Sequence, residues 1–178
     1  MTDKQQNMML DWMRKIHQLE YAHRYESLHY SKLERIVGIS AFVLTTLVAF
    51  SYRFPSVEPD IFDSLPFFLK HNFFVPIGSA IAAILTGILT FLKPSERSET
   101  HKKTGSNYEK LRHRIELIIT SSELHEKEFT KKMASIKEDW DDLDAINVSN
   151  RHFIQGKNKV NSFKKYPKEL SFLDDVRA

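Results

Sequence analysis

A basic and aromatic stretch near the end of the chain is the first place where residue types suggest chemistry. Between Asp144 and Glu169 there are six basic residues and no acid, with aromatic rings among them. Cations neutralise phosphate and rings stack on bases, so this composition predicts an anionic ligand such as a nucleotide or a single-stranded oligonucleotide. A tail that touches anionic lipid needs much the same composition. The residues are Arg151, Phe153, Lys157, Lys159, Phe163, Lys164, Lys165, Tyr166 and Lys168.

A second group of basic residues follows the uncharged segment 72–92. It consists of Arg97, Lys102, Lys103, Arg112 and Arg114. A formal net charge of +3 over 178 residues is too small for a general nucleic-acid binder, so an anionic partner must bind a local patch. We expect the ligand to contact this group first and the C-terminal stretch second.

Small and hydroxyl side chains recur every four residues within the segment 72–92, at Gly78, Ala82, Thr86 and Thr90. Such a stripe lets two helices pack closely, and it can also line a pore with hydroxyl groups. One pair of helices cannot enclose a pore, so the second interpretation requires a homo-oligomer. Both interpretations stay open at this point.

The motifs of common enzymes and metal sites are missing. The chain has no cysteine, no glycine-rich phosphate loop and no nucleophile elbow. His17, His23 and His29 are six residues apart, which places them on different faces of a helix rather than on the one face that a metal needs. We therefore expect no enzymatic activity, no catalytic residue, no cofactor and no metal.

Two apolar segments set the fold class. The average composition, 42% hydrophobic and 28% charged, conceals segments 36–52 and 72–92, which hold no charged residue over 17 and 21 positions. Helices of this length come close to or reach the thickness of a bilayer core. The alternative is a pair of buried core helices in a soluble protein. Because the segments hold no Asp, Glu, Lys or Arg, the proton relays of active transporters are missing.

The distribution of Lys and Arg predicts the topology. Six basic residues lie within 20 positions after the second segment, whereas the connection 53–70 holds two against three acids. By the positive-inside rule, both termini face the cytoplasm. We predict a cytoplasmic helix over 1–35, membrane spans over 36–53 and 71–93, a short outer loop over 54–70, a cytoplasmic helix over 94–145 and a basic C-terminal segment over 146–178.

Apolar residues at alternating spacings of three and four predict two long cytoplasmic helices that extend both spans. Thr2 and Gln5 form a candidate capping box at the start of the first helix. The second helix would be continuous, with one extra residue between Phe129 and Met133 as a stutter. The two apolar seams would pack against each other or against neighbouring subunits in a coiled-coil-like manner. They comprise Met9, Trp12, Ile16, Leu19, His23, Tyr30, Leu33 and Val37 in the first helix, and Tyr108, Leu111, Ile115, Ile118, Ser122, His125, Phe129, Met133, Ile136, Trp140 and Leu143 in the second.

The order of these elements resembles the SLATT family of bacterial two-span proteins over residues 10–150. The similarity lies in the run 21–25, the end of the second span at Leu92, Lys93 and Pro94, and the helix with Tyr108, Leu111 and Arg112. The resemblance implies an effector of anti-phage conflict systems that perforates the inner membrane and is paired with a nucleotidyltransferase through its nucleotide product. It implies no catalytic residues.

The sequence thus predicts an all-α, oligomeric membrane protein with a two-helix transmembrane hairpin, and two functions remain open. The first is a homo-oligomeric pore or channel in the bacterial inner membrane, controlled by a nucleotide or oligonucleotide, whose opening depolarises the cell. The second is a membrane-anchored scaffold that recruits a cytoplasmic partner and does not conduct. In both cases membrane lipid surrounds the spans.

Overall fold

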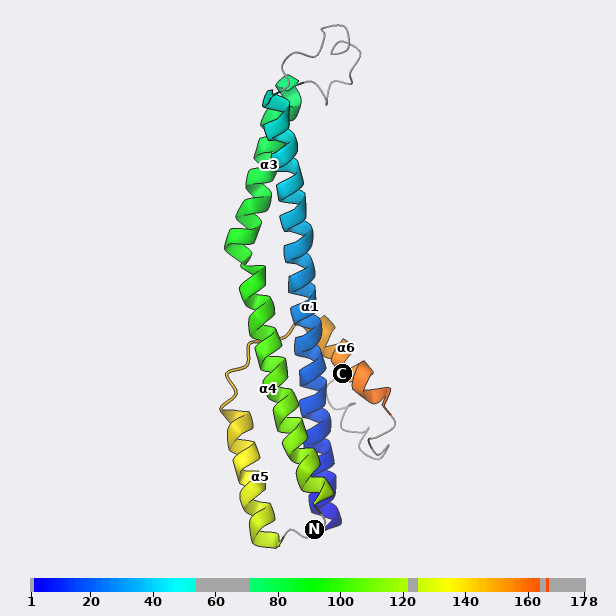
Figure 1. The fold of residues 1–178 in the computed structure, drawn as a ribbon. Coiled ribbons are helices and arrows are strands. Elements are labelled where there is room, and N and C mark those ends of the chain that lie inside the picture. Colours follow the sequence, from blue (N-terminus) through cyan, green and yellow to red (C-terminus); the bar gives the residue numbers. More distant parts are fainter. Residues whose placement is uncertain (1, 54–70, 122–124, 164–165, 167–178) are drawn as a thin grey trace. The chain divides into compact units, whose positions relative to one another are not determined.

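The computed structural model describes residues 2–53, 71–121, 125–163 and 166, and all regular structure within them is helical. The helices are α1 (Asp3–Arg53), α3 (His71–Leu92), α4 (Pro94–Thr120), α5 (Glu126–Asp141) and α6 (Asn150–Asn161) (Figure 1). The chain divides into two compact units, one formed by Met1–His29 and Ser98–Ala178 and the other by Tyr30–Arg97. We call the first the polar bundle and the second the apolar hairpin.

The predicted capping box is present at the start of α1. The amide of Thr2 donates to Oε1 of Gln5 at 2.8 Å, and the amide of Gln5 donates to Oγ1 of Thr2 at 3.3 Å. These reciprocal bonds satisfy amides that have no partner inside the helix. From here α1 continues without interruption to Arg53, so the predicted continuity of the N-terminal helix with the first apolar segment is confirmed.

The apolar hairpin consists of the second half of α1 and of α3. Its two helices touch through small or slender side chains, because Ala41, Val48, Val75 and Ala82 are buried while most larger apolar side chains are exposed. Both helices are long and apolar enough to cross a membrane, with mean hydropathy of 1.8 and 2.1 over their best 18-residue windows. Only 17% and 11% of these windows are buried, which does not fit core helices of a soluble protein.

Lys93 separates α3 from α4. Its φ angle of 44° lies in the left-handed region, which is unusual for a residue other than glycine. Pro94 follows, and it disfavours a right-handed helical conformation in the residue before it. This pair of residues explains why α3 ends at Leu92 and a new helix begins at Pro94.

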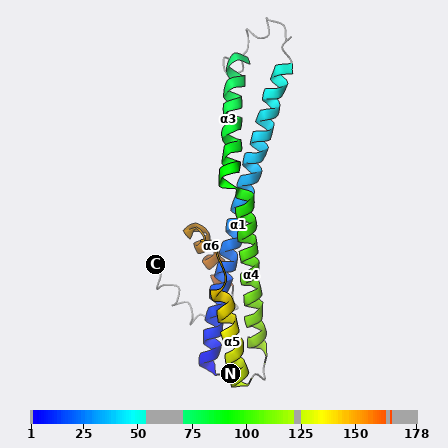
Figure 2. The same cartoon turned by 90° about the vertical axis from the view of Figure 1, so that its left-hand side faces the viewer.

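The polar bundle has one apolar core, shared by α1, α4 and α5 (Figure 2). The predicted seam residues Met9, Ile16, Ile115 and Ile136 are buried completely or almost completely. At the edge of the core, the rings of Trp12 and Trp140 meet edge to face at 5.9 Å. The core is formed by Met9, Met13, Ile16, Tyr108, Leu111, Ile115, Ile118, Phe129, Met133 and Ile136.

The structure replaces the predicted continuous helix over 94–145 with two helices. α4 ends at Thr120, and α5 begins at Glu126 and runs back along α4 (Figure 1). The hydroxyl of Ser121 bonds to the carbonyl of Leu117 at 2.6 Å, and such local bonds favour helix ends over helix interiors. Because the chain reverses, the apolar residues of α4 and α5 pack against each other and against α1 within one chain. Seam burial therefore does not require neighbouring subunits.

A further helix, α6, covers another face of α1 where the sequence predicted only a basic segment. Ser149 caps its start by accepting from the amide of His152. Gly156 lies so close to α1 that a Cβ there would come within 2.6 Å of the carbonyl oxygen of Gln18 and 2.8 Å of the amide of Ala22. The two backbones are thus in direct contact, and Val160 completes the contact as a fully buried side chain.

Candidate functional site

The four residues of the stripe predicted to line a pore differ in exposure. Gly78 and Ala82 are buried inside the hairpin, and a Cβ at Gly78 would lie 2.8 Å from Cγ2 of Val48. Thr86 and Thr90 are exposed, and their hydroxyls donate to the carbonyls of Ala82 and Thr86 at 2.9 and 3.0 Å. In the isolated hairpin the first half of the stripe packs two helices together, and the second half is exposed.

The predicted cations near the second span have different surroundings. Arg97, in the apolar hairpin, lies over the ring of Tyr30 at 5.7 Å, whereas Lys102 and Lys103 are exposed in the polar bundle. Arg112 is mostly buried, and its guanidinium binds Glu20 at 2.9 Å and Glu116 at 2.6 Å. Two carboxylates therefore hold the guanidinium of Arg112 inside the bundle.

The aromatic rings of the C-terminal basic stretch are engaged within the chain. Phe163 stacks on His17 with ring centroids 5.5 Å apart, and the hydroxyl of Tyr166 lies 2.6 Å from Nδ1 of His17. Lys159 lies over the ring of Phe163 at 5.5 Å. Of the remaining predicted cations, Arg151 is exposed and Lys157 half-buried on α6, while Lys164, Lys165 and Lys168 lie outside the described residues. The rings of Phe163 and Tyr166 thus contact α1 through His17.

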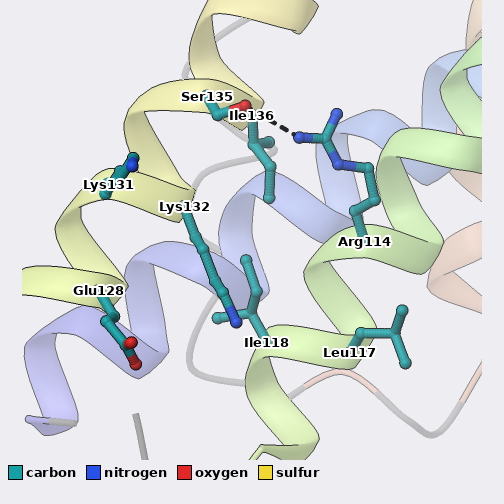
Figure 3. A pocket seen from close by; sticks show the side chains of 8 residues that line it. All are labelled: Arg114, Leu117, Ile118, Glu128, Lys131, Lys132, Ser135 and Ile136. Carbon is teal, nitrogen blue, oxygen red and sulfur yellow. Dashed lines mark hydrogen bonds between the residues drawn. The ribbon is translucent and has the colours of Figure 1, made fainter. Parts of the chain in front are cut away.

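A groove between α4 and α5 gathers cations over an apolar floor (Figure 3). Its volume is about 520 Å³. Ile118 and Ile136 are buried in the floor, whereas Leu117 is 67% exposed. The groove is lined by Arg114, Leu117, Ile118, Glu128, Lys131, Lys132, Ser135 and Ile136. Sequence analysis singled out Arg114 in this set but missed Lys131 and Lys132, because only the reversal of the chain brings them opposite α4.

A second groove shares Arg114 and has a volume of about 570 Å³. It contains the predicted Lys103 together with Lys110, but three carboxylates line it as well, so its charges balance. The lining consists of Thr100, Lys103, Thr104, Asn107, Lys110, Leu111, Arg114, Asp139, Asp142, Leu143 and Asp144. The structure therefore brings Lys103 and Arg114 to one groove, and Lys102 lines neither of these two grooves.

Ionised groups inside the polar bundle form a network around Glu20, which is 2% exposed. Its carboxylate binds Arg112 from α4 and Arg24 from its own helix, each at 2.9 Å. Arg24 also binds Glu109 at 3.0 Å. Each bond of Glu20 offsets part of the cost of burying its charge, so loss of one partner leaves an uncompensated ion.

Two histidines face each other one turn further along α1. Nδ1 of His23 lies 3.0 Å from Nδ1 of His101, and both residues are buried. Because one ring nitrogen must accept while the other donates, the pair excludes simultaneous protonation of both facing nitrogens. Burial, followed by the charge of His101, lowers the pKa of His23 to about 4. His23 is thus neutral at physiological pH.

Glu26 joins α6 to α1. Its carboxylate accepts from Nδ1 of His152 and from the hydroxyl of Ser149, the latter at 2.9 Å. Burial by itself raises the pKa of Glu26, but the hydrogen bonds from His152 and Ser149, together with the charges of His152 and His101, lower it below its ordinary value. The spacing of the first helix placed His23 in its seam, but it did not indicate that His101 would contact His23 or that His152 would contact Glu26.

No group of three or more His, Asp or Glu side chains within the described ranges is arranged to hold a metal ion. The chain matches no protein-family model, no curated protein and no solved structure. Function is therefore inferred from the residues and their geometry.

Proposed function

We propose that the protein is a pore-forming effector of a bacterial anti-phage defence system. It would form a homo-oligomer in the inner membrane, and a nucleotide or oligonucleotide would control its opening. The open pore depolarises the membrane and arrests growth or kills the cell. The observation that carries the proposal is the apolar hairpin, in which the uncharged segments 36–52 and 72–92 leave most of their large side chains exposed.

The exposed side chains favour lipid and further copies of the chain as neighbours. Burial of apolar surface is the main source of stability in water, and an uncovered apolar surface of this extent marks a membrane or protein contact. Because a hairpin of two helices encloses no lumen, conduction requires several copies. The exposed hydroxyls of Thr86 and Thr90 on α3 are the polar groups proposed to face the lumen.

The polar bundle, in which the ligand would bind, and the apolar hairpin, which would form the pore, are joined by continuous stretches of the chain. α1 supplies residues to both units without a break, and α4 begins directly after Lys93 at the end of α3. A ligand shifts a closed–open equilibrium only through its different affinities for the two states, so it must contact elements that rearrange on opening. The resemblance to the SLATT family supports a nucleotide as this ligand and a nucleotidyltransferase as its source.

Ion current through planar bilayers tests the proposal. Purified full-length protein should conduct, and the current should change when candidate nucleotides are added. Thr86→Leu with Thr90→Leu should reduce the current without changing assembly, because it removes the hydroxyls of the proposed lumen. Thr46→Leu on α1 is the matched control, since its hydroxyl also bonds only to its own helix, at Phe42. Unreduced current in the double variant would exclude this face as the lumen.

The same preparation tests the topology and the non-conducting alternative. Protease added to intact spheroplasts should spare the polar bundle, because both termini are proposed to be cytoplasmic. A protein that assembles in bilayers but never conducts, with or without nucleotides, would favour the membrane-anchored scaffold.

A further inference from the structure

We infer that the groove between α4 and α5 is a binding site for a phosphorylated small molecule with an apolar, planar face, specifically a nucleotide. The choice of a nucleotide rests on the proposed function, whereas the site itself is argued from its residues. The groove differs from the sites that sequence analysis considered, because two of its three cations come from α5.

The groove holds an excess of positive charge. Arg114, Lys131 and Lys132 contribute three cations against two acidic residues, Glu128 in the lining and Asp139, which pairs with Arg114, so the excess is one positive charge. Within the part of the chain that the structure describes, neither lysine makes an ion pair, in contrast to Lys137, which binds Asp141 on the same helix. The neighbouring groove, with its balanced charges, offers no such excess. The α4–α5 groove is therefore the better site for an anion.

Arg114 is held in place for binding. Its guanidinium donates to Asp139 and, at 3.1 Å, to the hydroxyl of Ser135, as Figure 3 shows for the second bond. An arginine carries five N–H donors, so these two bonds orient the group and leave donors for a ligand. A fixed planar guanidinium beside two flexible ammonium groups suits the oxygens of a phosphate chain.

The floor of the groove accounts for the apolar part of the ligand. Leu117 is 67% exposed, whereas Ile118 and Ile136 are 6% and 0% exposed and add little accessible surface. One exposed leucine can contact one face of a base, but it is too small to cover the two acyl chains of a phospholipid. A volume of about 520 Å³ lies within the range of about 300–1,000 Å³ that is typical of small-molecule sites.

A ligand in this groove would connect two helices. Its phosphates would contact Arg114 on α4 and Lys131 and Lys132 on α5, while the base would lie between the two helices. Binding therefore stabilises the arrangement in which α5 runs back along α4, and it favours whichever state of the pore has this arrangement.

Calorimetric titration of full-length protein in nanodiscs of zwitterionic lipid tests the site, with ATP as the probe. Inorganic triphosphate and adenosine supply the charge and the ring separately, and each should bind more weakly than ATP. Lys131→Glu with Lys132→Glu should weaken ATP binding at least about tenfold, since each lost charged hydrogen bond is typically worth that much. Helix content should not change, because both lysines are exposed.

Lys4→Glu with Lys127→Glu is the matched control, since both lysines are exposed, line neither groove and undergo the same change of charge. It should weaken ATP binding less than about threefold, because long-range attraction between exposed charges is largely screened by salt. An equal loss in both double variants would overturn the inference, and so would no loss in the Lys131 and Lys132 variant. Absence of ATP binding at millimolar concentration would overturn it as well.

Two further readouts separate the remaining explanations. Displacement of ATP by soluble short-chain phosphatidylglycerol more readily than by triphosphate would assign the groove to a lipid headgroup and overturn the inference. Ion current from the same preparations keeps site and pore apart. Current without ATP binding would leave the pore proposal intact and reject the groove as a nucleotide site. ATP binding without current would support the groove as a nucleotide site and reject the pore.

Discussion

The polar bundle and the apolar hairpin bury opposite kinds of side chain. All nine of the buried polar or charged residues in the described ranges belong to the polar bundle. Of the sixteen exposed large hydrophobic residues in those ranges, eleven belong to the apolar hairpin, although it is the smaller unit. One α-helix, α1, takes part in both. The difference teaches that helix formation is common to the two units and that the surrounding solvent decides which side chains face outward.

Introducing charge on the exposed face of the hairpin should have the largest effect. We expect Phe42→Arg with Ile84→Arg to cost roughly 5 to 7 kcal/mol of membrane insertion, because each arginine near the centre of a span costs about 2.5–3.5 kcal/mol. Both positions are more than 60% exposed, so the same changes would be harmless in water. Membrane fractionation and flotation measure the loss. Leu117→Arg, equally exposed in the polar bundle, should fractionate like the wild type. If the double variant stays in the membrane fraction, the exposed face of the apolar hairpin does not contact lipid, and the proposed difference in surroundings between the two units is wrong.

Removing a charge from inside the polar bundle should have the next largest effect. Glu20→Ala leaves Arg112 mostly buried with one of its two carboxylates gone, and we expect about 3–5 kcal/mol of lost stability. Thermal and urea unfolding in detergent, followed by circular dichroism, gives the change. Glu96→Gln breaks an exposed pair with Lys93 and serves as control, with an expected change below about 1 kcal/mol. Equal effects of the two changes would mean that the Glu20 network does not stabilise the bundle.

Acid should destabilise the polar bundle through His23. Below its ordinary pKa of 6.5 the unfolded chain binds a proton at this residue, but folded His23 stays neutral down to about pH 4. The free energy of unfolding should therefore fall by about 3 kcal/mol between these two pH values. Glu26 adds a further loss at lower pH, because its pKa is lowered in the folded state. His23→Gln should flatten the upper part of this dependence, and an unchanged slope in urea titrations would contradict the assignment.

Replacement of glycines by alanine should have the smallest effects, and it compares the helix packing of the two units directly. Gly156→Ala puts a methyl group against the backbone of α1, so we expect about 1–3 kcal/mol of lost stability. Gly105→Ala has only ordinary contacts, at 3.5 Å, and should stabilise α4 by up to about 1 kcal/mol. Gly78→Ala in the hairpin meets the side chain of Val48, which can shift, and should cost less than Gly156→Ala. Thermal unfolding ranks the three, and a larger loss for Gly78→Ala than for Gly156→Ala would reverse this interpretation of the contacts.

Hydrophobic spacing predicted the residues of the apolar segments and all residues of the bundle core except Met13. It did not predict the reversal between Thr120 and Glu126, because a seam with the same spacing continues on both sides of the turn. It also missed α6, whose contact with α1 depends on the absence of a side chain at Gly156. The partners of the buried carboxylates were invisible for a different reason. Glu20 and Arg112 are 92 residues apart, and Glu26 and His152 are 126 residues apart, so no local pattern connects them.

The direct backbone contact of α6 with α1 constrains how related chains can diverge. Ala22 and Gly156 occupy one shared space, so enlargement of either residue in evolution must be accompanied by reduction of the other or by loss of the helix contact. Gly87 has no atom within 4 Å of the position where its Cβ would lie, so no contact within the chain limits the size of the residue at this position. In descendants of a common ancestor, positions 22 and 156 should therefore covary in volume, and position 87 should vary independently of both.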